Sequence, residues 1–89
     1  MGTLAKETDK KKNQEITTTI ARRARIALHM NNMTSADLMR TTTLGAGTIS
    51  ELLNAKKSVY TYTLVRVAEG LGVSMDWLCG LSDKPKMGK

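Results

Sequence analysis

The residues with the clearest chemical character lie in the stretch TTTLGAGTISELLNAKK, residues 41–57. Gly45 and Gly47 fall where the pattern indicates the start of a helix, although glycine weakens a helix interior by about 1 kcal/mol relative to alanine. One explanation is that a large partner has to approach the backbone of this helix closely. Lys56 and Lys57 follow the helix and add positive charge. The stretch therefore indicates a binding surface.

The charge of the chain narrows the class of partner. Fourteen Lys and Arg residues against eight Asp and Glu residues give a formal net charge of +6. A polyanion is one explanation, because each phosphate that a protein neutralises releases counterions. The other explanation is a soluble basic domain without such a partner. The 89 residues allow one small domain, and with 40% apolar residues and no Phe its core is expected to be aliphatic, as in packed helices.

Residues that could catalyse a reaction lack the neighbours that catalysis requires. His29 has no carboxylate or second histidine at helical spacing, and Ser50 and Ser74 have no base nearby in the sequence. The single cysteine, Cys79, excludes an internal disulfide and is expected to be a small buried residue. We therefore expect a non-enzyme without metal or cofactor. No apolar run approaches the roughly 18 residues of a membrane span, so we expect a cytoplasmic protein without a membrane partner.

Apolar spacing and capping signals predict five short helices. Thr34 and Asp37 have the spacing of a capping box, Gly72 has the position of a helix stop, and Ser74 precedes the last helix as a cap. The expected helices cover about residues 16–31, 35–42, 46–53, 62–71 and 75–81. No strand pattern is present in the sequence. The fold class is therefore expected to be all-α.

Four apolar residues have the spacing of a helix-turn-helix motif. Counted from Ser35 as the first position, Leu38, Leu44, Ile49 and Leu52 fall fourth, tenth, fifteenth and eighteenth. With the segments MTSADLM, LGAGTISELLNAK, TLVRVAEGLGVS and MDWLCGLSD, the chain resembles the Cro/repressor-type (XRE) family of DNA-binding proteins over about residues 16–81. The resemblance implies a compact lambda-repressor-like bundle of five short helices and double-stranded DNA as partner.

Two residues depart from the family pattern within the motif. The fifth position, which is usually small because the two helices cross there, is Met39. The ninth position, which is usually glycine because the turn needs a left-handed backbone, is Thr43. A β-branched residue there costs about 1–2 kcal/mol if the turn is standard. These departures concern the geometry of the turn and leave the expected fold unchanged.

The resemblance implies that the helix of about residues 46–53 enters the major groove. The residues expected to contact bases are Ala46, Gly47, Thr48 and Glu51. None of them is Arg, Lys, Gln or Asn, so DNA shape is expected to supply much of the specificity. Alternatively, the base-reading side chains come from Lys56, Lys57 or the N-terminal segment. Glu51 either accepts a hydrogen bond from cytosine N4 or points to solvent or to a neighbouring lysine.

Phosphate contacts are implied at the start of the second helix and after the third. The residues concerned are Thr34, Ser35, Asn54, Lys56, Lys57 and Ser58, with Arg22, Arg23 or Arg25 as further candidates; the lysine pair is otherwise a solvated loop. Residues 1–15 are expected to form a flexible basic tail, with four lysines against three acidic residues. That tail is either mobile or an arm along DNA phosphates through Lys10, Lys11 and Lys12. Residues 82–89 are expected to form a polar C-terminal tail.

The resemblance also implies a homodimer, because one recognition helix covers only half of an operator. Trp77 and Leu81 are the expected dimer contacts, although Trp77 alternatively only covers the core of its own domain. The leading hypothesis is a sequence-specific transcriptional regulator that represses by occluding a promoter. The alternatives are an antitoxin that binds and neutralises a partner toxin and regulates its own operon, and a fold relative that no longer binds DNA.

Overall fold

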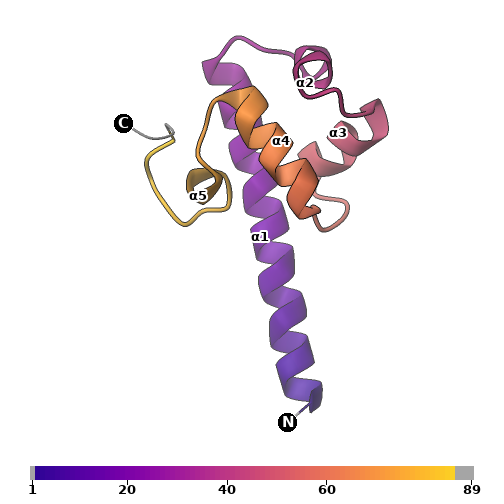
Figure 1. Ribbon diagram of the computed structural model, residues 1–89. Coiled ribbons are helices and arrows are strands. Elements are labelled where there is room, and N and C mark those ends of the chain that lie inside the picture. Colours follow the sequence, from indigo (N-terminus) through magenta and orange to yellow (C-terminus); the bar gives the residue numbers. More distant parts are fainter. Residues whose placement is uncertain (1, 86–89) are drawn as a thin grey trace.

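The computed structural model describes residues 2–85, with side chains from residue 10 onward, and folds into five helices. These are α1 (Gly2–Met30), α2 (Ser35–Thr42), α3 (Ala46–Leu53), α4 (Thr61–Leu71) and α5 (Met75–Leu78). In Figure 1, α1 runs the length of the molecule, α4 crosses in front of it, and α5 and α3 lie on opposite sides of α4. The expected all-α class, order of helices and bounds of the second and third helices are confirmed.

An aliphatic core joins α1 to the four shorter helices. Leu38 of α2 and Leu78 of α5 are fully buried, and Ile49 of α3 is 1% exposed. Around them pack Ile20, Ala24, Ala27, Leu28, Leu52, Leu53, Val67, Ala68, Leu71, Val73 and Trp77. Leu44 is partly buried against this core, so the four apolar positions of the predicted motif all face the interior: Leu38, Leu44, Ile49 and Leu52. Met39 is also partly buried there. Because helices of two or three turns are marginal by themselves, their stability comes from this packing.

The five helices of the described chain share one kind of ending. Each is followed by a residue with left-handed backbone, with φ between 53° at Asn32 and 88° at Gly80. The others are Thr43, Ala55 and Gly72. After α4, for example, the N–H groups of Gly72 and Val73 donate to the carbonyls of Glu69 and Ala68. The reversal satisfies carbonyl groups that would otherwise lack partners at the end of each helix.

The turn between α2 and α3 is of the standard kind despite its unusual residues. Thr43 has φ 60° and ψ 20°, the left-handed conformation in which glycine is usual, and its N–H donates to the Met39 carbonyl. Met39 lies at the edge of a hollow of about 400 Å³ between α1, α2 and α3, so its larger side chain has room. The threonine therefore adopts a strained backbone without changing the geometry of the motif.

Two predicted helix limits are wrong. The first helix begins at Gly2 and not near residue 16. The segment before residue 16 lacks an apolar stripe, but it contains four lysines, two glutamates and a glutamine, which favour helix. The last helix ends at Leu78 and not near residue 81, because Gly80 turns left-handed and the Leu81 N–H donates back to the Asp76 carbonyl.

The segment after α5 returns to the domain. The N–H of Ser74 donates to the carbonyl of Pro85 over 2.8 Å. This bond holds residues 82–85 of the expected polar tail near the start of α5. Residues 1 and 86–89 of the two predicted tails lie outside the described residues. Within the described chain, no helix is long and apolar enough to cross a membrane.

Replacing Thr43→Gly tests the strain in the turn. Glycine removes the penalty of a β-branched residue at φ 60° but adds freedom to the unfolded chain, so the free energy of unfolding should rise by up to about 1 kcal/mol. Urea unfolding measures the change. The control Thr18→Gly, at an exposed position within α1, should lower it by about 0.5 kcal/mol. Loss of stability in both variants would contradict the prediction.

Candidate nucleic-acid interface

The start of α2 is closed by the predicted capping box. The Thr34 hydroxyl oxygen accepts from the Asp37 N–H over 3.1 Å, and an Asp37 carboxylate oxygen accepts from the Thr34 N–H over 2.9 Å. An ion pair with Arg40 balances the charge of Asp37. Of the donors in this first turn, the N–H groups of Ser35 and Ala36 have no acceptor within the described part of the chain. Ser35 and Ala36 are both exposed.

The start of α3 lacks a side-chain cap. Gly45 occupies the N-cap position with an extended backbone, φ −70° and ψ 160°, and makes no capping hydrogen bond. A Cβ atom added to Gly45 or Gly47 would meet no other atom within 4 Å. Neither glycine has a positive φ, so neither the turn nor the packing of the described protein requires glycine here. The start of α3 is therefore open to close approach from outside the chain.

The exposed face of α3 carries the four predicted base contacts. Ala46, Gly47 and Thr48 are exposed, and Glu51 is half-buried. A groove of about 320 Å³ separates Thr48 and Glu51 from the start of α4. The Lys57 Nζ atom lies 3.4 Å from a carboxylate oxygen of Glu51. Glu51 therefore pairs with a neighbouring lysine in the free protein, which was one of the positions expected for its side chain.

The end of α3 is held by an arginine of α1. Arg25 donates through Nε to the Leu53 carbonyl over 3.0 Å and through Nη2 to the Asn54 side-chain oxygen over 3.0 Å. The Asn54 amide nitrogen donates in turn to the Ser50 carbonyl over 2.8 Å. Both polar ends of the Asn54 side chain are therefore engaged inside the protein. The exposed Arg25 guanidinium lies beside it, where phosphate contacts were expected.

The other two candidate arginines lie in different surroundings. Arg23 donates through Nη1 to the carbonyls of Trp77 and Ser82 over 2.9 and 2.8 Å. Its guanidinium also lies 5.0 Å from the centre of the Trp77 ring, within cation–π range. Arg23 therefore fixes α5 and the following turn to α1. Arg22 is exposed on the same helix.

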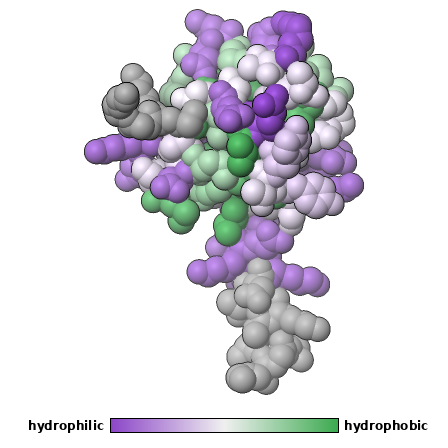
Figure 2. Space-filling model, in the orientation of Figure 1, coloured by the Kyte–Doolittle hydropathy of each residue, from purple (hydrophilic) through white to green (hydrophobic). Residues whose placement is uncertain are grey.

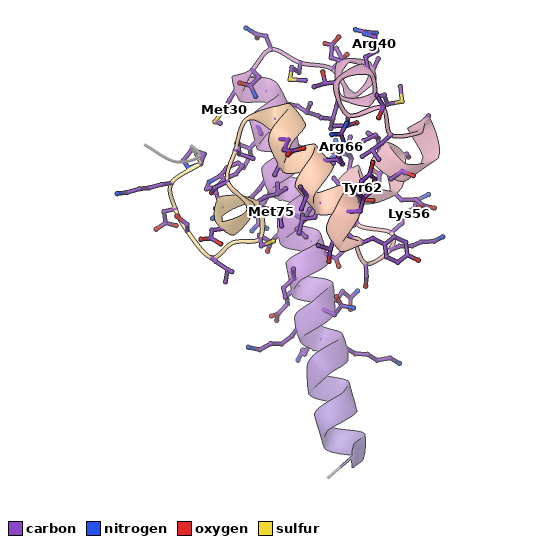
Figure 3. All side chains as sticks on the ribbon, in the orientation of Figure 1. Met30, Arg40, Lys56, Tyr62, Arg66 and Met75 are labelled. Atoms are coloured by element: carbon purple, nitrogen blue, oxygen red, sulfur yellow. The ribbon has the colours of Figure 1, made fainter. Side chains whose placement is uncertain are left out.

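The loop between α3 and α4 presents the remaining predicted phosphate contacts. Lys56, Lys57 and Ser58 are exposed, and Figure 3 shows Lys56 at the edge of the domain. The Ser58 hydroxyl oxygen accepts from the Asn13 amide over 2.7 Å, which ties the N-terminal half of α1 to this loop. Sequence analysis did not identify Asn13, because no local pattern connects two residues 45 positions apart.

The two expected dimer contacts differ in exposure. Trp77 is 6% exposed and packs in the core of its own domain, as one interpretation had it. Leu81 is 80% exposed. Of the two, only Leu81 offers surface to a partner.

Comparison with known proteins identifies a DNA-binding domain in this chain. Residues 25–84 match the family model of the Cro/C1-type HTH DNA-binding domain, a range that includes α2 to α5 and the end of α1. No curated protein and no solved structure matches the chain. Within the described residues, no group of three or more His, Cys, Asp and Glu side chains is placed to hold a metal ion.

The capping box predicts a specific dependence of stability on pH. The Thr34 N–H, assisted by the Thr34 hydroxyl and by Arg40, holds the pKa of the Asp37 carboxyl below its ordinary value. Because the folded pKa is lowered, the stability that Asp37 contributes is present above pH about 4 and is lost as the pH falls through the folded pKa. Between pH 7 and pH 2, wild type should lose more stability in urea than the variant Asp37→Asn. Parallel losses would contradict this.

Proposed function

Because the chain belongs to the Cro/C1-type helix-turn-helix DNA-binding family, we propose that it is a sequence-specific transcriptional repressor. In this proposal α3 enters the major groove of an operator and the bound protein occludes a promoter. The observation that carries the proposal is the start of α3, where Gly45 and Gly47 meet nothing within the protein and no side chain caps the helix. An uncapped helix start with free N–H groups attracts phosphate and permits close approach.

Groups that bind phosphate flank α3 on both sides. The N–H groups of Ser35 and Ala36 precede it, with the Thr34 hydroxyl beside them. After it come Lys56 and the Ser58 hydroxyl, with the exposed guanidinium of Arg25 at the end of the helix. Contacts on both sides fix the orientation of a recognition helix on the duplex without selecting a sequence. This arrangement supports the insertion of α3 between two phosphate strands.

The exposed face of α3 supports a modest direct readout. Ala46 can contact a thymine methyl group, Thr48 can hydrogen-bond to several bases, and Glu51 can accept from cytosine N4. The short side chains at Ala46 and Gly47 allow α3 to lie deep in the groove. Sequence-dependent DNA shape then supplies the remaining specificity. Under this proposal the protein is cytoplasmic, because it has to reach the operator DNA.

Selection of binding sites from random duplexes tests the proposal. Wild-type protein should enrich one palindromic site whose half-sites lie about one helical turn apart, roughly 34–36 Å. The affinity for that site should fall steeply as the salt concentration rises. If no sequence is enriched and binding to all duplexes is equal, the protein is not a sequence-specific regulator.

Lys56→Ala should weaken binding to every sequence by a similar factor. Lys56 is exposed beside α3 and is proposed to neutralise one phosphate, so its removal should reduce the slope of log affinity against log salt by about one unit. Fluorescence anisotropy on the selected operator and on an unrelated duplex measures both effects. Lys84→Ala, an exposed lysine after α5, is the matched control and should change neither. Equal effects of the two variants would refute the assignment of Lys56.

Leu81→Glu should reduce self-association. Figure 2 shows hydrophobic side chains around the turn after α5 and where α1 leaves the domain, and Leu81, with 80% exposure, belongs to that turn. A carboxylate in a dimer contact would remain buried without a partner, so the dissociation constant should rise at least tenfold. Sedimentation equilibrium without DNA measures it. Tyr62→Ser, at an exposed aromatic residue beside the α3–α4 loop, should associate like wild type. Unchanged association of Leu81→Glu would exclude this turn from the dimer contact.

A further inference from the structure

One ion pair lies on the surface that is proposed to meet the bases. Lys57 reaches from the loop after α3 back to Glu51 on the helix, and their charged atoms lie 3.4 Å apart. Both side chains remain open to solvent, with 71% of Lys57 and 44% of Glu51 exposed. An exposed pair of this kind contributes little to folding stability. Its position on the exposed face of α3 therefore calls for a reason other than stability.

The groove beside α3 makes this pair distinctive. The groove is lined by Thr48, Glu51, Leu52, Lys57, Ser58, Val59, Tyr60 and Thr63. Among these described residues, only Glu51 and Lys57 carry a charge. Lys57 thus differs from Lys56, which forms no ion pair within the described residues. Lys56 lies at the edge of the domain (Figure 3). The two neighbouring lysines therefore present their charges to different surroundings.

A C·G base pair has a matching pattern on its major-groove edge. Cytosine presents the N4 amino group as a donor, and guanine presents O6 and N7 as acceptors. Cytosine N4 and guanine O6 are hydrogen-bonded to each other, so they lie roughly 3 Å apart. A carboxylate and an ammonium group at a similar separation can accept from the cytosine and donate to the guanine at the same time. T·A and G·C pairs present the donor and the acceptor in the opposite order. An A·T pair offers a donor and an acceptor in the same order, adenine N6 and thymine O4, but it has the thymine methyl group where the C·G pair has the second acceptor, guanine N7. A lysine that reaches N7 as well as O6 therefore distinguishes C·G from A·T.

We propose that Glu51 and Lys57 together read one C·G base pair in each half-site. Glu51 accepts a hydrogen bond from cytosine N4, and Lys57 donates to O6 or N7 of the paired guanine. This inference rests on the proposed insertion of α3 into the major groove. It assigns Lys57 to base recognition and leaves Lys56 as a phosphate contact.

The pairing also removes an electrostatic difficulty. A lone carboxylate on a helix in the major groove is repelled by the phosphates on both sides. Lys57 offsets that charge in the free protein and, in the proposed complex, stays beside Glu51 while both bind the base pair. If Lys57 instead left to bind a phosphate, Glu51 would face the DNA without compensation.

The experiment compares variants on the selected operator and on every single-base-pair substitution of it. Glu51→Ala and Lys57→Ala should each relax the preference for C·G at the same position, by about 10- to 100-fold. The double variant should lose no more discrimination there than either single variant, because the two residues read one pair as a unit. Lys57→Arg should retain the preference, because a guanidinium also donates to guanine. Lys56→Ala is the matched control and should leave all base preferences unchanged.

Each contrary result has a definite meaning. If Lys57→Ala weakens all duplexes equally, as Lys56→Ala should, Lys57 is a phosphate contact and the inference is wrong. If the two single variants relax different positions, the residues do not read one pair. Both outcomes leave the proposed function intact, because wild type still selects an operator. If wild type selects none, the proposed function and this inference fail together. Circular dichroism of each variant verifies that the exposed substitutions leave the fold unchanged.

Discussion

The domain depends on side chains that donate to the last carbonyl groups of helices elsewhere in the fold. Four helices are held in this way: Arg66 donates to Thr42 at the end of α2, Arg25 to Leu53 of α3, Asn31 to Leu71 of α4 and Arg23 to Trp77 of α5. The last carbonyls of a helix have no partner within it, and they carry a partial negative charge that favours a cation. In helices as short as these, such groups are a large share of the backbone, and satisfying them joins the helices to one another.

This use of arginine changes how the basic charge of the chain is understood. Arg23, Arg25 and Arg66 donate to carbonyl groups of the protein, so some of the side chains behind the net charge of +6 also hold the fold together. Arg25 serves both purposes, since it holds the end of α3 and remains exposed beside it. In the proposed complex, this contact at the end of α3 would keep the orientation of the helix on DNA constant. The fold and the binding surface therefore share residues.

The beginnings of the helices differ in how they are capped. Thr34 caps α2 and Ser74 caps α5 with side-chain oxygens. The starts of α3 and α4 have no side-chain cap, and at α3 the N-cap residue is Gly45, with open space around it. A bare helix start forgoes a stabilising hydrogen bond, so it is expected where an external group replaces the cap. In the proposed complex, DNA is that group at the start of α3.

The sequence by itself determined the features that depend on neighbouring residues. The bounds of α2 and α3, the capping box at Thr34 and the stop at Gly72 follow from contacts three to five residues apart, and the buried motif positions follow from helical spacing. Only the tertiary structure decided which arginines bind carbonyl groups at the ends of other helices. It also decided that Asn13 reaches Ser58 and that Lys57 lies against Glu51. The separations of 28 residues from Arg25 to Leu53 and 59 from Arg23 to Ser82 leave no trace in a local pattern, because the packed core alone brings such partners together.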